Sequence, residues 1–100
     1  MGKSKKSLFK EQLYSVWGVE FIDLIAQLTQ VKIHELGEFL KNYEGAWYSI
    51  SDFIDCNFEQ SLKNNFGDGE IDYVWFWSYI KDDYVIYIDN NKMIHHIFKK

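Results

Sequence analysis

The residues of this chain that most often carry chemistry are its three histidines, His34, His95 and His96, and its single cysteine, Cys56. A nucleophilic site would pair a serine or cysteine with a histidine and an orienting acid. His34 falls in a segment with helical spacing, whereas His95 and His96 are adjacent in a predicted strand. Neighbouring strand residues point to opposite faces, so these two imidazoles are not placed to share a metal ion. We therefore expect each histidine to have a structural role and not a catalytic or metal-binding one.

Acidic residues alternate in Asp68-x-Glu70-x-Asp72, a spacing that resembles the start of a calcium-binding loop. The EF-hand loop also needs a glycine at its sixth position and a distant bidentate glutamate, and this segment supplies neither. The chain also lacks the GxGxxG and Walker A motifs that bind phosphates. The sequence accordingly predicts no metal, no other cofactor and no enzymatic activity.

The distribution of charge is the most distinctive feature of the sequence. All fifteen acidic residues lie between Glu11 and Asp89, where only four lysines accompany them, so this segment carries a formal charge of −11. The other seven lysines lie near the two ends and hide this excess in the whole-chain value of −4. The chain has no arginine to make the bidentate contacts that phosphate and guanine recognition favour. This layout predicts a basic protein partner and no direct binding of nucleic acid.

One predicted helix gathers three of these acids. Asp52, Asp55 and Glu59 lie within about 60° of one another on a helical wheel, and only Lys63, one turn later, offsets them. An acidic surface with large aromatic rings suits a basic protein cleft, because charge accelerates encounter and buried rings slow dissociation. The predicted partner-binding residues, drawn from this helix and from in and around the predicted sheet, are Asp52, Asp55, Glu59, Glu70, Asp72, Asp82, Asp83, Trp75 and Trp77.

The elements that would position these residues begin with two helical segments. Apolar spacing from Ser7 to about Leu28 predicts a first helix with a break or kink near Gly18. A second helix is predicted over residues 32–43, with Gly45 as its stop signal.

A third helix carries the acidic cluster. It is predicted to start near Ser49 or Ser51, where Ser49-x-x-Asp52 resembles a capping box, and to end at residues 64–67. Its apolar stripe, and hence its predicted buried face, consists of Phe53, Ile54, Phe58 and Leu62.

Beyond Gly69 the period of the pattern changes from about 3.6 to 2. β-branched and aromatic residues alternate over 71–80, which predicts a central strand with Trp75 and Trp77 on one face and Phe76 on the other.

Two further strands are predicted after this segment. Residues 81–83 form a predicted turn into a strand over 84–89, and Asn90-Asn91 suits a two-residue hairpin turn into a last strand over 92–98. Three N-terminal helices followed by a three-stranded antiparallel β-meander constitute an α+β fold.

Length and composition predict one small domain over residues 1–100, since the chain is 47% hydrophobic and too short for two domains. Residues 1–6 are rich in lysine without apolar periodicity, so a flexible basic tail is expected there. No segment has the apolar core of a signal peptide or the ~20 apolar residues of a membrane span, which favours a cytoplasmic protein that does not bind membranes.

Together these properties favour a stoichiometric inhibitor, namely an immunity protein or antitoxin that neutralises a basic bacterial toxin such as a nuclease. The absence of proline and arginine, with many Ile, Asn, Tyr and Phe residues, is typical of AT-rich bacterial and phage coding sequences. One alternative is a phage-type DNA-mimicking inhibitor of a host defence nuclease, of the anti-CRISPR or anti-restriction kind. Another is a winged-helix DNA-binding protein, which has three helices followed by a hairpin. The acidic excess argues against DNA binding, because phosphate contacts dominate affinity for DNA.

Overall fold

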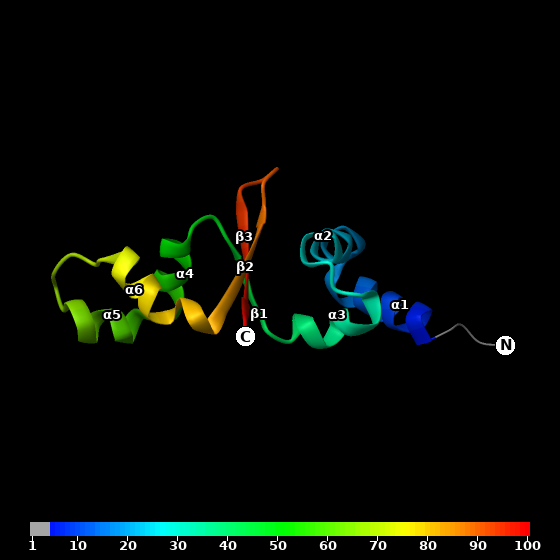
Figure 1. The fold of residues 1–100 in the computed structure, drawn as a ribbon, viewed down its shortest axis with the longest axis horizontal. Coiled ribbons are helices and arrows are strands. Elements are labelled where there is room, and N and C mark those ends of the chain that lie inside the picture. Colours follow the sequence, from blue (N-terminus) through cyan, green and yellow to red (C-terminus); the bar gives the residue numbers. More distant parts are fainter. Residues whose placement is uncertain (1–4) are drawn as a thin grey trace. The chain divides into compact units, whose positions relative to one another are not determined.

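The computed structural model describes residues 5–100, with side chains from Glu11 onward, and divides the chain into two compact units, Met1–Tyr43 and Glu44–Lys100. The described residues form six α-helices and a three-stranded antiparallel sheet, with helices interleaved between strands (Figure 1). The predicted α+β class is confirmed, whereas the predicted simple meander is wrong. The prediction of a single domain over residues 1–100 stays a prediction.

The first unit contains the helices α1 (Lys5–Trp17), α2 (Val19–Thr29) and α3 (Ile33–Leu40). Gly18 separates α1 from α2, as predicted, with a φ of 91° that residues with a side chain rarely adopt. Helix α1 packs against α2 and α3. From Glu11 onward, the buried hydrophobic side chains of this unit come from α2 and α3 and are Ile22, Ile25, Leu36 and Leu40.

The predicted tail, residues 1–6, lies partly outside the described residues, since positions 1–4 are not described and α1 begins at Lys5. Among residues 5–100, no helix combines the length and the hydropathy needed to cross a membrane.

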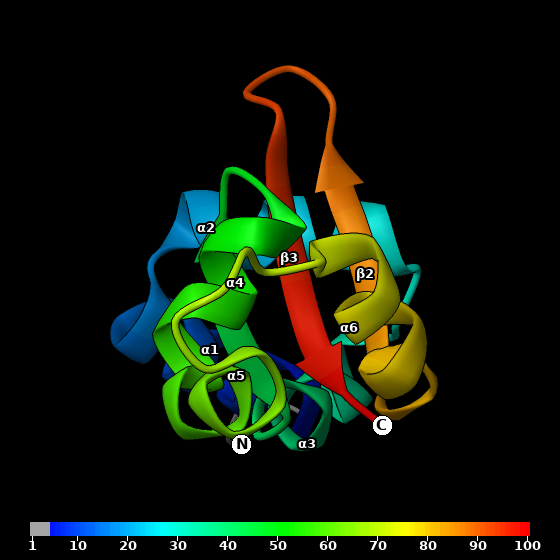
Figure 2. The ribbon, with the colours of Figure 1, turned by 90° about the vertical axis from the view of Figure 1, so that its left-hand side faces the viewer.

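The second unit combines three helices with the sheet. Its elements in chain order are β1 (Tyr43–Trp47), α4 (Ile50–Asn57), α5 (Glu59–Phe66), α6 (Tyr73–Ile80), the 3-10 turn η1 (Lys81–Asp83), β2 (Tyr84–Asp89) and β3 (Ile94–Lys99). The strand order is β1-β3-β2, so β3 is the central strand. Helices α4, α5 and α6 lie on one side of the β2–β3 hairpin (Figure 2).

The core of the second unit lies between these helices and the sheet. All three helices and the central strand contribute buried side chains to it, namely Phe53, Ile54, Leu62, Phe76, Ile80 and Ile97. Phe58 and Tyr84 are partly buried and pack edge-on against Phe53, with ring centroids 5.8 and 5.2 Å from it. The predicted buried face of the third helix is confirmed, although Phe58 divides that helix into α4 and α5.

The start of the third helix is also confirmed. The Ser49 hydroxyl accepts a hydrogen bond from the backbone N–H of Asp52 at 3.1 Å and caps α4. This bond satisfies one of the backbone donors that a helix N-terminus leaves without an intrahelical partner.

The predicted helix over 32–43 is confirmed from Ile33 to Leu40, but its predicted stop signal, Gly45, lies inside β1. Gly45 has a φ of 114°, and a Cβ atom there would lie 3.0 Å from Nε1 of Trp47. A glycine is therefore required by the backbone conformation and by the Trp47 ring that packs over it.

The segment predicted as a central strand, residues 71–80, forms no strand, and its residues Tyr73–Ile80 form helix α6 instead. The Asp72 carboxylate accepts the backbone N–H of Trp75 at 3.0 Å and caps this helix. Seven of the eight residues in YVWFWSYI are apolar or aromatic, so apolar residues fill both sides of the helix and no period of 3.6 is visible. The alternation of aromatic residues imitated the period of a strand.

The β2–β3 hairpin follows the prediction in its strands and departs from it in its turn. Strand β2 spans the predicted residues 84–89 and pairs antiparallel with β3, with Asp89 opposite Ile94. The predicted two-residue turn is wrong, because four residues, 90–93, connect the strands and the positive φ of 55° falls on Met93. The Asp89 carboxylate accepts the Asn91 N–H at 3.0 Å, which stabilises this longer loop.

Candidate partner-binding face

Acidic residues are concentrated in the second unit. Glu44–Lys100 contain ten acidic residues and five lysines, a formal charge of −5, whereas Met1–Tyr43 contain five acidic residues and six lysines. All nine predicted partner-binding residues belong to the second unit. A surface for a basic partner is therefore to be sought there.

The three clustered acids lie on two helices, because the predicted third helix breaks at Phe58. Asp52 and Asp55 are on α4, and Glu59 is the first residue of α5. All three are exposed. The break leaves Asp55 and Glu59 on the same shallow pocket of about 340 Å³, whose other lining residues are Leu62, Lys63, Gly67 and Ile71. The prediction that these acids share one surface therefore holds for Asp55 and Glu59.

Tyr73, which the sequence analysis did not select, connects these acids to α6. Its hydroxyl donates a hydrogen bond to Oδ1 of Asp55 at 2.6 Å. This hydrogen bond raises the pKa of the Tyr73 phenol, and burial and the negative charges of Asp55 and Asp52 raise it further. Because both carboxylates act on one phenol, Asp52, Asp55 and Tyr73 form one electrostatic cluster.

Lys63 is the only basic residue that lines the pocket of Asp55 and Glu59. Its ammonium group lies 3.3 Å from Oε1 of Glu59, and both side chains are largely exposed. An exposed pair of this kind contributes about 0.3–0.5 kcal/mol to stability. Asp52, Asp55, Glu59 and Lys63 together still carry two negative charges.

Glu70 and Asp72 extend this acidic surface toward α6. They line a second shallow pocket, of about 470 Å³, together with Ile71, Tyr73 and Val74. Ile71 also lines the first pocket, and Tyr73 is bonded to Asp55, so the two pockets are adjacent. We call the five acids of this surface the acidic face: Asp52, Asp55, Glu59, Glu70 and Asp72.

Asp82 and Asp83 lie apart from the acidic face, in η1 at the opposite end of α6 from Asp72. Both are exposed. Asp83 contributes, after burial and after Glu44, to a raised pKa of the Tyr84 phenol. These two acids therefore surround the C-terminal end of α6 and are not part of the acidic face.

The prediction that Trp75 and Trp77 share one face is wrong. They lie on a helix, where the side chains of residues i and i+2 point about 200° apart around the axis. Trp75 is 46% exposed and stacks on Tyr79 with a ring separation of 5.8 Å. Trp77 is partly buried against the core and lines a small pocket of about 190 Å³ with Val74 and Tyr73.

Sequence reasoning also missed the exposed side of α6. Val74 is 83% exposed and Tyr79 is 74% exposed, and they lie on the same side of the helix as Trp75 and Ser78. We call these four residues the outer face of α6. A helical wheel drawn for 73–80 would have grouped them, but the alternating pattern favoured a strand there.

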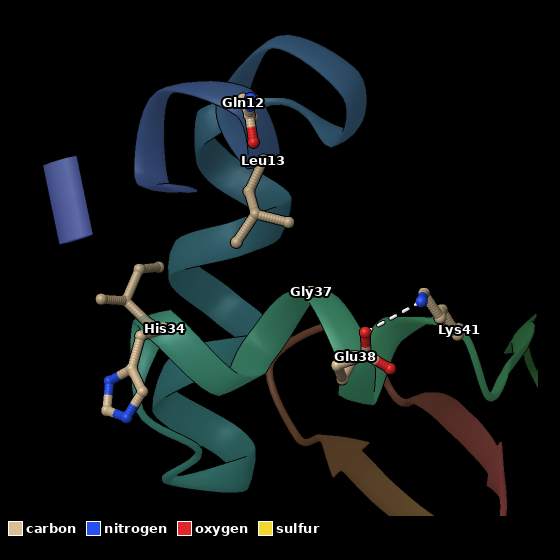
Figure 3. A pocket seen from close by; sticks show the side chains of 7 residues that line it. Gln12, Leu13, His34, Gly37, Glu38 and Lys41 are labelled. Atoms are coloured by element: carbon tan, nitrogen blue, oxygen red, sulfur yellow. Dashed lines mark hydrogen bonds and ion pairs between the residues drawn. The ribbon is translucent and has the colours of Figure 1, made fainter. Parts of the chain in front are cut away.

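A pocket of about 320 Å³ in the first unit is a weaker candidate. It lies between α1 and α3 and is lined by Gln12, Leu13, Ile33, His34, Gly37, Glu38 and Lys41. Leu13 points toward α3, and the imidazole of His34 points away from Leu13 (Figure 3). Glu38 and Lys41 form an ion pair at 2.9 Å, so their charges largely cancel. This lining offers neither a pair of groups suited to catalysis nor a net charge for a ligand.

The remaining chemistry-bearing residues are dispersed. His34 is on α3 beside Glu35, and His95 and His96 are adjacent in β3 and point to opposite faces of the sheet. His96 is buried, and burial lowers its pKa, while the charge of Asp89 partly opposes that shift. Within the described residues, no three His, Cys, Asp or Glu side chains are grouped so that they could hold a metal ion.

Neither a protein-family model, nor a curated protein sequence, nor a solved structure matches this chain. The functional argument therefore rests on the residues of the second unit.

Proposed function

We propose that this protein is a stoichiometric inhibitor that binds a basic bacterial toxin such as a nuclease through the acidic face of its second unit, in the manner of an immunity protein or antitoxin. The observation that carries the proposal is the contiguity of the acidic face: Asp55, Glu59, Glu70 and Asp72 line two adjacent pockets that Tyr73 connects through its hydrogen bond to Asp55, and Asp52 is one turn from Asp55 on α4. Nuclease active sites are basic clefts, because they bind phosphates.

The physical basis of binding is long-range attraction followed by burial of aromatic rings. Exposed carboxylates that lie close together repel one another, and this repulsion lowers the stability of the fold. Binding of a cationic partner would remove the repulsion. Complementary charge raises association rates more than it raises affinity. The exposed rings next to the acidic face, Trp75 and Tyr79, are of the kinds that contribute most to the lifetime of protein complexes.

The order of elements supports a second candidate, a winged-helix DNA-binding protein. Helix α6 precedes the β2–β3 hairpin, and β1 joins the sheet next to β3, which corresponds to the helices and wing of that fold. The charge of the element that would enter the DNA groove argues against this function. Residues 70–83 contain four acidic residues and one lysine, and the outer face of α6 contains no basic residue that could contact a phosphate. DNA binding depends on neutralising phosphates with basic side chains.

Association kinetics test the proposed function. The partner to test is a basic nuclease toxin, selected by searching the reading frames beside this protein's gene, and a DNA duplex serves as the competing ligand. We expect fast association at 0.01 M salt that slows steeply at 0.1 M, since the Debye length falls from ~30 to ~10 Å. Reversal of Asp52, Asp55 and Glu59 to Lys should lower the association rate constant by about tenfold or more at low salt.

A matched control separates the acidic face from net charge alone. Reversal of three exposed acids of the first unit, Glu20, Glu35 and Glu38, changes the net charge by the same amount and should have a much smaller effect. The milder set D52N, D55N and E59Q reports the same trend while it perturbs the helix N-termini less. Salt-independent association with the toxin, equal effects of the two reversals, or binding of the unmodified chain to the duplex would each overturn the proposal.

A further inference from the structure

The outer face of α6 is an apolar surface that no element of the second unit covers. Val74, Trp75, Ser78 and Tyr79 span an arc of about 140°, at ~100° per residue, and the exposed fractions of the three larger side chains are 83%, 46% and 74%. Phe66 extends this surface from α5, since its ring contacts Trp75 edge-on at 5.8 Å. Helices that are apolar all round are normally buried, so an outer face of this kind indicates a binding surface.

Acidic residues flank the outer face at both ends. Glu70 and Asp72 share a pocket with Val74 at the N-terminal end. Lys81, Asp82 and Asp83 follow at the C-terminal end and together carry a net charge of −1. The eight residues of α6 span about 12 Å. The charge pattern is therefore negative, apolar over two turns, and negative again.

This pattern identifies the chemistry of the occupant by charge complementarity. We propose that the outer face of α6 is the docking site for a basic amphipathic helix of the partner protein, with two apolar turns flanked at both ends by Lys or Arg. A helix suits the site because the outer face has two parallel rows of side chains, Val74 with Ser78 and Trp75 with Tyr79. The two residues of each row are four positions apart in sequence, and the side chains of a second helix can pack between the rows.

Other occupants meet repulsion at this site. A second copy of the chain would bring Glu70, Asp82 and Asp83 of one molecule near the same flanking acids of the other. An anionic lipid surface or a nucleic acid would face the same four carboxylates, and like charges placed together disfavour association. A basic segment alone turns both ends of the face into attractive contacts.

This inference extends the proposed function by assigning the contact that holds the partner after charge has brought it near. The acidic face governs the rate of encounter, and the outer face of α6 governs the lifetime of the complex.

A peptide titration tests the docking site directly on the full chain. The probe is a synthetic helix of about 16 residues, a length sufficient for partial helicity, with Leu and Ala on one face and two Lys at each end. The readout is the indole N–H resonance of Trp75, one of four tryptophans, assigned through the Trp75→Phe variant. We expect a saturable shift of this resonance, and no shift with a peptide in which Glu replaces each Lys.

Two tyrosines of similar exposure, one on the outer face of α6 and one outside it, provide a matched test and control. Tyr79 on α6 is 74% exposed and Tyr48, between β1 and α4, is 77% exposed. Tyr79→Ser should weaken peptide binding by about tenfold or more, as is typical for a contact aromatic residue, whereas Tyr48→Ser should change it by less than about twofold. The double variant E70K and D82K should weaken binding and reduce its salt dependence.

Several outcomes would overturn the inference. These are an unchanged Trp75 resonance, equal effects of the two tyrosine variants, equal binding of the Glu peptide, a Trp75 shift on concentrating the protein alone, or a shift with phosphatidylserine vesicles. Failure of the proposed function is separable from these. If the Lys peptide binds at Trp75 while the toxin shows no salt-dependent association, the docking site stands and the inhibitor function fails. If the toxin associates as expected but Tyr79→Ser leaves its dissociation rate unchanged, the inhibitor function stands and the docking site fails.

Discussion

Helix α6 carries aromatic side chains on two faces, and the two faces lie in opposite environments. On the inner face Phe76 is 1% exposed and Ile80 is 8% exposed, within the core that α4, α5 and β3 complete. On the outer face Val74 and Tyr79 are mostly exposed, although both side chains are largely apolar. Hydropathy therefore distinguishes the two faces only weakly, and the neighbouring elements decide which one is buried.

The difference between the two faces separates stability from recognition. Burial of a Phe side chain contributes roughly 1.5–3 kcal/mol to folding, whereas an exposed ring contributes little until something covers it. The inner face thus holds the second unit together, and the outer face keeps its apolar surface available for a partner. Substitutions on the two faces of the same helix should therefore have separable effects on folding and binding.

The largest expected effect is on the inner face. Phe76→Ala should lower the free energy of unfolding by about 3–5 kcal/mol, because it removes a fully buried ring and leaves a cavity. Tyr79→Ala truncates an aromatic residue on the outer face and should cost less than about 1 kcal/mol. Chemical denaturation of both variants is the measurement, and equal losses would show that the outer face is also part of the core.

A smaller effect is expected at the start of α6. Asp72→Ala removes the carboxylate that accepts the Trp75 N–H at 3.0 Å, and should cost about 0.5–2 kcal/mol. Asp72→Asn keeps the acceptor and should recover most of this loss. If Asp72→Asn and Asp72→Ala lose equal stability in thermal melts, then the charge of Asp72, and not its capping bond, stabilises the helix.

Elements of the fold were predictable where a turn residue, a helix cap or an alternating pattern interrupts the runs of apolar residues. Gly18, the Ser49 cap and the strand over 84–89 were identified because glycine conformation, capping and alternation are local signals. Helix α6 was not, because its cap, Asp72, fell inside the predicted strand over 71–80 and its apolar residues show no helical period. The strand order was beyond reach, since β1 pairs across the chain with β3.

The candidate site was predictable to a similar degree. Charge counting found the five carboxylates of the acidic face, because charged residues of this kind are almost always exposed. Tyr73 was missed because its bond to Asp55 joins residues 18 positions apart in two different helices. The pairing of Trp75 with Tyr79 depended on assigning a helix, and was lost with that assignment.

A still smaller effect on stability is expected at the most exposed position of α6. Val74→Ser should change the free energy of unfolding by no more than about 0.5 kcal/mol, since the side chain is 83% exposed. The same variant should weaken binding of the Lys peptide described above. A loss of stability comparable to that of Phe76→Ala would show that Val74 is covered in solution, and would remove the contrast between the two faces.

The last prediction concerns Tyr73, at the boundary between the faces, and involves almost no change in stability. Its bond to Asp55 holds its pKa above the ordinary value of 10, so Asp55→Ala should move the midpoint of its titration downward. Because the raised pKa belongs to the folded protein, the stability linked to this proton is fully present below pH 10 and is lost as pH rises through the raised pKa. NMR titration of tyrosines labelled at Cζ measures the midpoint, and Glu70→Ala is the control, since Glu70 is not among the causes of the shift. An unchanged midpoint in Asp55→Ala would show that the hydrogen bond between α4 and α6 does not form in solution. Asp52 and Asp55 would then be separate from Glu70 and Asp72, the part of the acidic face that adjoins α6.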